Sequence, residues 1–296
     1  MAVRESNTRA SSALRGGPLL EALRAPGPLR AVELRPPPAR LAGDDSRDAW
    51  IDLDRGVRRL LQRERFVLFT DDAVGDREEE SLRVLSDGLG GETDLSRVVP
   101  FLTCKHSLEY CRLFGRRAGA EGLGGVTVTG GDREVGVPRC LPRSRDLRAE
   151  LRPRAPGLPL GAWVNPFRDP AEQVELLMDP EHQADYFLTQ VVSHHDLEPV
   201  DRFLEEARRR DLSLPGLFGV FFYRSANPQT LQRLSDFMPV PSKALSAEFE
   251  AGAGAEEICA RTLRALHERG IQKVYVSNLK IVEASRRLDA VEGLLD

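Results

Sequence analysis

The sequence predicts a single-domain (β/α)8 barrel, an α/β fold in which eight parallel strands are each followed by a helix. Three observations predict it: short apolar runs alternate with stretches of 3.6-residue periodicity, there are eight such runs, and they span residues 29–296. Alternating units of this kind pair in parallel through right-handed crossovers. Eight of them in a chain of this length match the usual size of the barrel.

The expected strands are short runs rich in apolar and β-branched residues. They are LRAVEL at 29–34, RFVLFT at 65–70, VVPFLTC at 98–104, GVTVTG at 125–130, LPLGAWV at 158–164, DYFLTQVV at 185–192, LPGLFGVF at 214–221 and KVYVSN at 273–278.

The expected helices show apolar residues at helical spacing and end near glycine or charged residues. They cover 50–64, 77–90, 108–122, 199–211, 255–270 and 281–295. Residues 1–28 are rich in Ser, Arg, Gly, Ala and Pro, so we expect a mobile N-terminal tail there. Within this tail, LLEALRA has the pattern of a short helix.

An open doubly wound sheet is the main alternative fold. Such a sheet normally has a glycine-rich phosphate-binding turn directly after its first strand, where this chain has RPPPARL. The GLGG run at 122–125 follows an expected helix and precedes an expected strand. That is the wrong order for a dinucleotide turn, so the sequence favours the barrel.

Composition restricts the classes of partner. The chain has 42 basic and 46 acidic residues, a formal net charge of -4, which predicts no general attraction to nucleic acid or anionic membranes. It has no long apolar run and no apolar leader. Its four cysteines are widely spaced, which argues against disulfides and a cysteine zinc site. We expect a cytoplasmic protein that binds small molecules; the oligomeric state stays open.

Glu33 is the first candidate for chemistry. It stands near the end of the first expected strand, directly before Leu34, and three prolines then stop the strand at 36–38. If Val32 and Leu34 face the helices, Ala31 and Glu33 face the barrel axis. The carboxyl ends of the strands are where this fold builds its active sites, so we expect Glu33 at a site.

The other strand ends also supply polar or aromatic side chains, a distribution that suits a polar, ring-shaped ligand over the barrel mouth. The candidates, in chain order, are Thr70, Asp71, Thr103, Lys105, Asp132, Asn165, Gln190 and Phe221.

Three other chemistries stay open at these strand ends. His194 and His195 could bind a metal, but adjacent residues on a helix diverge by about 100°, which disfavours a shared ion. Cys104 near His106 could be a nucleophile, although a buried filler is the commoner role. Lys105 is the only lysine at a strand end that could form a Schiff base, as in an aldolase.

Several of these motifs, taken in order, resemble the methylenetetrahydrofolate reductase family. They are VELRPPP around Glu33, FLTCKH in the third strand, TGGD at the end of the fourth, FLTQ in the sixth and LPGLFGV in the seventh. The resemblance covers roughly residues 29–280. It implies a barrel that reduces 5,10-methylenetetrahydrofolate to 5-methyltetrahydrofolate.

The resemblance also implies roles for single residues. Glu33 matches the general acid of the family, Gln190 matches the residue that binds folate, and Asp132 matches the acid near pterin and cofactor. Thr103 and Phe221 are expected to line the substrate pocket. Four more are expected on the cofactor side: Thr70, Asp71, Lys105 and Asn165.

The departures from the family pattern concern the flavin. Phe101 replaces a histidine, Gly130 replaces an arginine, and Asn165 and Asp169 replace a tyrosine and a histidine. The next segment has no Lys or Arg between 168 and 202, and an acidic surface repels the diphosphate of FAD. We therefore expect the chain to resemble a flavin-independent branch of the family, found in actinobacteria, that takes hydride directly from NADH. A FAD-dependent reductase with an altered flavin site and a non-catalytic folate-binding barrel are the alternatives.

Overall fold

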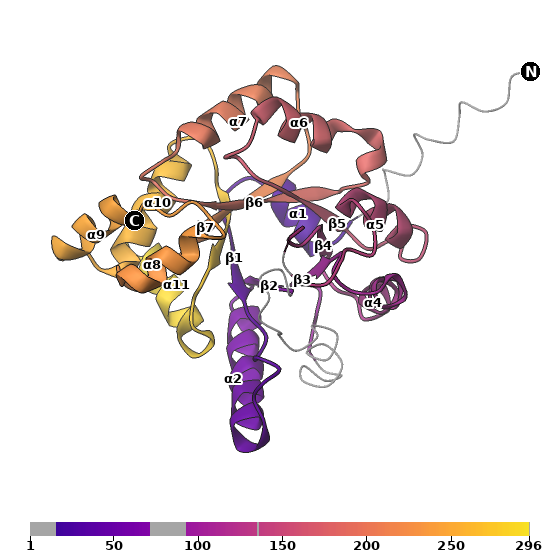
Figure 1. The fold of residues 1–296 in the computed structure, drawn as a ribbon, viewed down its shortest axis with the longest axis horizontal. Coiled ribbons are helices and arrows are strands. Elements are labelled where there is room, and N and C mark those ends of the chain that lie inside the picture. The colour runs from indigo at the N-terminus through magenta and orange to yellow at the C-terminus, as the bar shows by residue number, and fades with distance from the viewer. Residues whose placement is uncertain (1–15, 72–92, 135, 296) are drawn as a thin grey trace, which may run out of the picture.

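The computed structural model describes residues 16–71, 93–134 and 136–295. In these ranges eight parallel strands form a closed barrel in the order β1 to β8, and β8 pairs with β1 (Figure 1). The predicted (β/α)8 fold is confirmed. The strands are β1 (Leu29–Leu34), β2 (Phe66–Phe69), β3 (Val98–Thr103), β4 (Val126–Thr129), β5 (Leu160–Val164), β6 (Tyr186–Val192), β7 (Gly216–Phe221) and β8 (Lys273–Ser277).

Each strand lies within two residues of its expected bounds. The largest shifts are at the starts of β5 and β7, which begin two residues later than expected. Pro159 and Pro215 occupy the positions just before these strands. Proline has no amide hydrogen to give to a sheet, which accounts for the later starts.

The helices surround the barrel (Figure 1). They are α1 (Pro18–Arg24), α2 (Gly43–Gln62), α4 (Leu108–Ala120), α5 (Ser144–Leu151), α6 (Pro170–Met178), α7 (Glu198–Arg209), α8 (Pro228–Ser235), α9 (Ser242–Glu250), α10 (Ala255–His267) and α11 (Ala284–Glu292), with short 3-10 turns η2 (Pro180–His182) and η3 (Ile281–Glu283). The helix expected at 77–90 lies outside the described residues. Four of the described helices had no expected range: α5, α6, α8 and α9.

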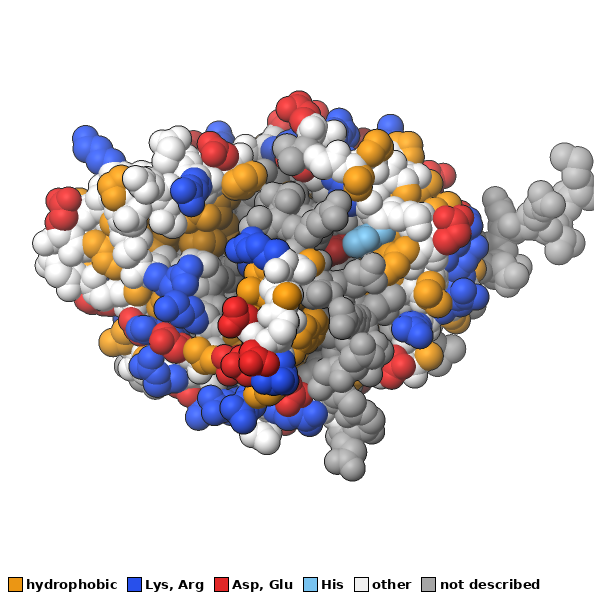
Figure 2. Space-filling model, turned by 60° about the horizontal axis from the view of Figure 1, so that its bottom comes forward, with side chains coloured by type: hydrophobic (Ala, Val, Ile, Leu, Met, Phe, Trp, Pro, Cys, Tyr) orange, Lys and Arg blue, Asp and Glu red, His pale blue; other side chains and the backbone are white. Residues whose placement is uncertain are grey.

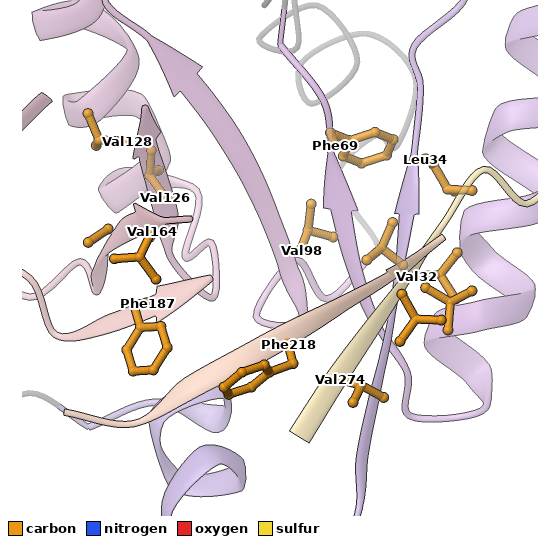
Figure 3. Packing of buried hydrophobic residues seen from close by; sticks show 14 of the residues in the cluster. Val32, Leu34, Phe69, Val98, Val126, Val128, Val164, Phe187, Phe218 and Val274 are labelled. Carbon is orange, nitrogen blue, oxygen red and sulfur yellow. The ribbon is translucent and has the colours of Figure 1, made fainter. Parts of the chain in front are cut away.

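The strands separate two apolar layers. Val32 and Leu34 of β1 belong to the outer layer between strands and helices, and Figure 3 shows side chains of this layer from several strands. Leu29 and Ala31 of the same strand belong to the inner layer that fills the barrel. The alternation follows from the two-residue period of a strand. Glu33 is on the same side of β1 as Ala31, as predicted.

Helix α1 closes the bottom of the barrel, at the N-terminal ends of the strands. Leu19, Leu20 and Leu23 are all at most 5% exposed and join the inner layer. Lys273, at the start of β8, donates hydrogen bonds of 2.7 Å to the carbonyl oxygens of Ala22 and Ala25. The short helix expected from LLEALRA within the N-terminal tail is present, and it is packed against the barrel because three leucines on one face cover the open end of the inner layer.

Tyrosines and glycines fit together inside the barrel. A Cβ atom on Gly161 would lie 2.5 Å from the ring of Tyr186, and one on Gly219 would lie 2.5 Å from the hydroxyl of Tyr275. Tyr275 donates that hydroxyl to the carbonyl oxygen of Thr189. The interior is thus a packed core, and proteins of this fold bind their ligands at the carboxyl ends of the strands.

The outer surface carries both signs of charge, interspersed across the face that Figure 2 shows. Among the described residues, no helix combines the length and the apolar character needed to cross a bilayer.

Candidate functional site

Glu33 projects into the upper end of the barrel from β1. Its carboxylate oxygen Oε1 accepts a hydrogen bond of 3.0 Å from Oγ of Ser277 at the end of β8, the strand next to β1. The side chain is half-buried, and the loss of water around it raises the pKa of Glu33 above its ordinary value. The Ser277 hydrogen bond and the Arg35 charge oppose this rise in pKa but are the smaller effects. A raised pKa favours the protonated carboxyl, which is the form that can donate a proton.

Trp163 is a part of the mouth that we did not predict. Its neighbours Ala162 and Val164 belong to the outer layer, so alternation along β5 turns the indole inward. The indole interacts with the side chain of Tyr275, whose phenol in turn lies close enough to Glu33 for their charges to interact. Trp163 is nevertheless 37% exposed. A large aromatic side chain exposed near the end of β5, and linked to the acid through Tyr275, suits stacking on a flat ring.

Asp71 and His106 form a polar cluster at the ends of β2 and β3. The Asp71 carboxylate is 6% exposed and accepts a 2.6 Å hydrogen bond from the backbone N–H of Thr103. Nε2 of His106 lies 2.8 Å from Oδ1 of the same carboxylate. Sequence reasoning placed Asp71 and Thr103 here but missed His106 as their partner. Neighbouring parallel strands bring their ends together, and that signal could have identified the pair.

Lys105 and the loop after β4 lie against each other. Nζ of Lys105 donates a 2.8 Å hydrogen bond to the carbonyl oxygen of Val137. The lysine methylene chain passes over Gly131, where a Cβ atom would lie 2.7 Å from Cγ and where φ is +69°. Only glycine accommodates both conditions. Oδ1 of Asp132 accepts a 2.7 Å hydrogen bond from the backbone N–H of Glu134, which orients the acid at the head of the loop.

Arg139 occupies the space beside Gly130, where the family pattern has an arginine. A Cβ atom on Gly130 would lie 2.7 Å from Cζ of Arg139. The Arg139 guanidinium also donates to the carbonyl oxygen of Gly131. A guanidinium therefore lies at this corner of the barrel although it comes from a position nine residues further along the chain.

The remaining expected residues lie at the ends of β5, β6 and β7. Oδ1 of Asn165 accepts a 3.0 Å hydrogen bond from the N–H of Phe167, within its own turn. Oε1 of Gln190 accepts a hydrogen bond of 2.9 Å from the N–H of Val191, in a stretch of β6 where the pairing register against β7 shifts. The Phe221 ring lies 4.9 Å from that of Tyr223. Each is at the expected strand end, and Thr70 follows β2 directly.

Cys104 does not face the mouth. It belongs to the outer layer under the helices, and burial raises the pKa of its thiol to about 12. His106 is engaged with Asp71 instead. The nucleophilic cysteine–histidine pair that we left open is therefore absent.

We expected His194 and His195 in a helix, but they are in a tight turn, in which the N–H of Asp196 donates to the carbonyl oxygen of Ser193. The divergence of about 100° expected for adjacent helical residues therefore does not apply to them. Their ring centroids lie 3.9 Å apart.

The acidic segment after β5 is partly neutralised by arginines from other helices. Asp179 accepts a 2.7 Å hydrogen bond from Arg145 of α5, and Glu175 lies 3.9 Å from Arg210 after α7. The charge of the segment alone therefore overstates how strongly this region repels a diphosphate.

Comparison with known proteins bears on the fold. No family model and no curated protein matches the chain. A protein from Clostridium thermocellum that binds two copies of 5-methyl-5,6,7,8-tetrahydrofolic acid shares the fold with a TM-score of 0.64 and 14% identity, over 93% of this chain and 97% of that one. An F420-dependent secondary alcohol dehydrogenase, in complex with an F420-acetone adduct, has a TM-score of 0.55 and 10% identity over 92% and 100%.

Proposed function

We propose that this barrel reduces 5,10-methylenetetrahydrofolate to 5-methyltetrahydrofolate with hydride taken directly from NADH, without bound flavin. The observation that carries the proposal is Glu33, an inward-facing carboxyl with a raised pKa at the mouth of the barrel. The resemblance of the strand-end motifs to methylenetetrahydrofolate reductases supports the same chemistry. A barrel of the same fold that binds 5-methyltetrahydrofolic acid supports the substrate class.

The reaction needs an acid because the five-membered ring of the substrate must open before hydride can add. Protonation of N10 makes that amine a leaving group, the C–N10 bond breaks, and an iminium forms at N5. Hydride addition to the former bridging carbon then gives the methyl group. One proton and one hydride are consumed, and Glu33 is assigned the proton.

Other side chains at the mouth are assigned to binding. Trp163 offers a face for the pterin, and Asp132 and Gln190 offer polar atoms for its amide and amino edges. Thr103 and Phe221 complete the substrate side of the pocket.

The nicotinamide is assigned to the sector of Thr70, Asp71, Lys105 and Asn165. The adjacent Asp71–His106 pair and the Lys105 ammonium supply hydrogen-bonding groups there. When bound, NADH supplies the hydride.

The direct test is the identity of the hydride donor. Purified protein is mixed with 5,10-methylenetetrahydrofolate and, in parallel, with NADH, NADPH, reduced F420, or NADH plus FAD. We expect a colourless protein that consumes NADH in step with product and gains nothing from FAD. Turnover that requires added FAD, or that uses only reduced F420, would replace the donor in this proposal. Folate binding without turnover with any donor would support the non-catalytic alternative.

Replacement of Glu33 by Gln should keep folate binding and remove most turnover. The amide has nearly the same shape but cannot donate the required proton, and general acids contribute about 10²–10⁴-fold to rate. Binding is read from the fluorescence of Trp163 in a Trp50→Phe background, since the chain has two tryptophans. A rate above about a tenth of wild type, with binding intact, contradicts the assignment of Glu33.

A further inference from the structure

His194, His195 and Glu248 gather beside the barrel on elements that the proposed reaction does not use. The histidines are in the turn after β6, and Glu248 is on α9. Each of the three residues offers a ligand atom, and these atoms all lie within 4.8 Å of one another. The set comes from two segments more than fifty residues apart in sequence, so the fold itself brings it together.

The distances suit a tetrahedral ion. Nε2 of His194 lies 3.2 Å from Oε1 of Glu248, and Nε2 of His195 lies 3.1 Å from Oε2. Zinc binds imidazole nitrogen and carboxylate oxygen at about 2.0–2.2 Å, so tetrahedral ligand atoms are about 3.3–3.6 Å apart. The pairs require only a small widening to hold an ion between them.

The second ring nitrogens already have partners that fix the ring orientation. Nδ1 of His194 lies 2.8 Å from Oγ1 of Thr262, whose hydroxyl donates to the carbonyl oxygen of Ile258. Since that hydroxyl proton is used, Oγ1 is placed to accept from Nδ1–H of His194, which leaves Nε2 on the side of Glu248. Nδ1 of His195 lies 2.7 Å from Oγ of Ser193. Histidines that bind metals characteristically have such outer partners.

Two buried atoms of the cluster have only each other. Nε2 of His195 and Oε2 of Glu248 lie 3.1 Å apart, and apart from this contact neither has a hydrogen-bond partner among the described residues. The His195 side chain is only 9% exposed. Polar atoms left in this way are costly unless something joins them, and a cation between them would remove the cost.

Arg261 is the competing cation. Its guanidinium donates to Oε1 of Glu248 and also to Glu257, and its side chain is 38% exposed. It therefore occupies one oxygen of Glu248 and leaves Oε2, the oxygen that faces His195, for another ligand.

From this geometry we propose that His194, His195 and Glu248 bind a divalent transition-metal ion of the zinc class through Nε2, Nε2 and the carboxylate. Two histidines and one carboxylate form a known ligand set for zinc, with the fourth position left to water. The ion would fasten α9 to the turn after β6. The proposal does not depend on the reaction assigned to Glu33.

The test is calorimetric titration of the chelator-treated full chain with Zn²⁺, and in parallel with Mg²⁺, which imidazole ligands do not suit. We expect one Zn²⁺ site, no Mg²⁺ site, and a higher unfolding temperature with Zn²⁺, because an ion that binds only the folded chain stabilises it. Absence of Zn²⁺ binding to the wild-type protein overturns the proposal without any variant.

Variants locate the ion. Glu248→Gln should weaken Zn²⁺ binding at least about tenfold, and Thr262→Val, which removes the outer partner of His194, should weaken it about 10–100-fold. Glu257→Gln is the matched control, because Glu257 also pairs with Arg261 but does not face the histidines. Equal weakening in Glu257→Gln and Glu248→Gln would place the ion elsewhere and reject the site.

Discussion

For Glu33 and Trp163, the strand pattern predicts the direction of the side chain but not its exposure. The inward direction of the Glu33 side chain could be predicted. Three prolines mark the end of the strand, and side chains alternate between its two faces, which puts Glu33 on the face opposite to Val32 and Leu34. Trp163 obeys the same alternation, but it stands in an apolar run where a core position is the ordinary expectation. Its exposure depends on what lies above it at the mouth, which strand periodicity does not encode.

The raised pKa of Glu33 predicts a pH-dependent cost in stability. A carboxyl whose pKa is higher in the folded than in the unfolded chain stabilises the fold below the unfolded value, about 4.3, and loses that contribution as pH rises through the folded value. Glu33→Gln cannot ionise. We therefore expect the free energy of unfolding of Glu33→Gln, relative to wild type, to increase with pH from about 4.3 and then level off above the folded pKa.

Urea unfolding at a series of pH values measures this difference, which amounts to about 1.4 kcal/mol for each unit that separates the two pKa values. A difference between Glu33→Gln and wild type that stays flat across the pH series would show that folding does not raise the pKa of the Glu33 carboxyl.

At the scale of elements, periodicity identified the strands and the helices α2, α4, α7, α10 and α11, while α5, α6, α8 and α9 had no expected range and α1 depended on context. LLEALRA is too short for a stable isolated helix, so its sequence alone does not decide between a tail and a packed helix. The open lower end of the inner layer decides it, because that end accepts three leucines. The His194–His195 turn is a similar case, since a helix expected there gave the wrong direction for both rings.

Helix α1 should contribute measurably to stability. Leu20 is fully buried in the inner layer, so Leu20→Ala should lower the free energy of unfolding by about 2–5 kcal/mol. Glu21→Ala on the exposed side of the same helix should change it by less than about 1 kcal/mol. Chemical denaturation of the full chain measures both. Equal small effects would mean that the barrel is stable without its lower cover.

At the scale of the whole molecule, strand order and closure followed from the alternation of eight strands with helices, since parallel neighbours require crossovers. The carboxyl ends of parallel strands necessarily lie at the same end of the barrel. Most of the predicted site residues lie at that end because they were chosen at strand ends. Contacts among those ends could not be predicted: the pairing of Asp71 with His106 and the place of Arg139 beside Gly130 depend on loop paths. Loops lack the regular residue spacing that helices and strands have, so their sequence does not predict where their side chains lie.

The lower cover of the barrel has a consequence for how the protein is made. The leucines of α1 leave the ribosome early, yet the inner layer that they join includes Tyr186, Leu217 and Tyr275, which are translated much later. Lys273, which holds the end of α1, comes later than most of the chain. During synthesis the apolar face of α1 is therefore exposed until the later strands are made. A chain released before the eighth strand would leave that face exposed to chaperones.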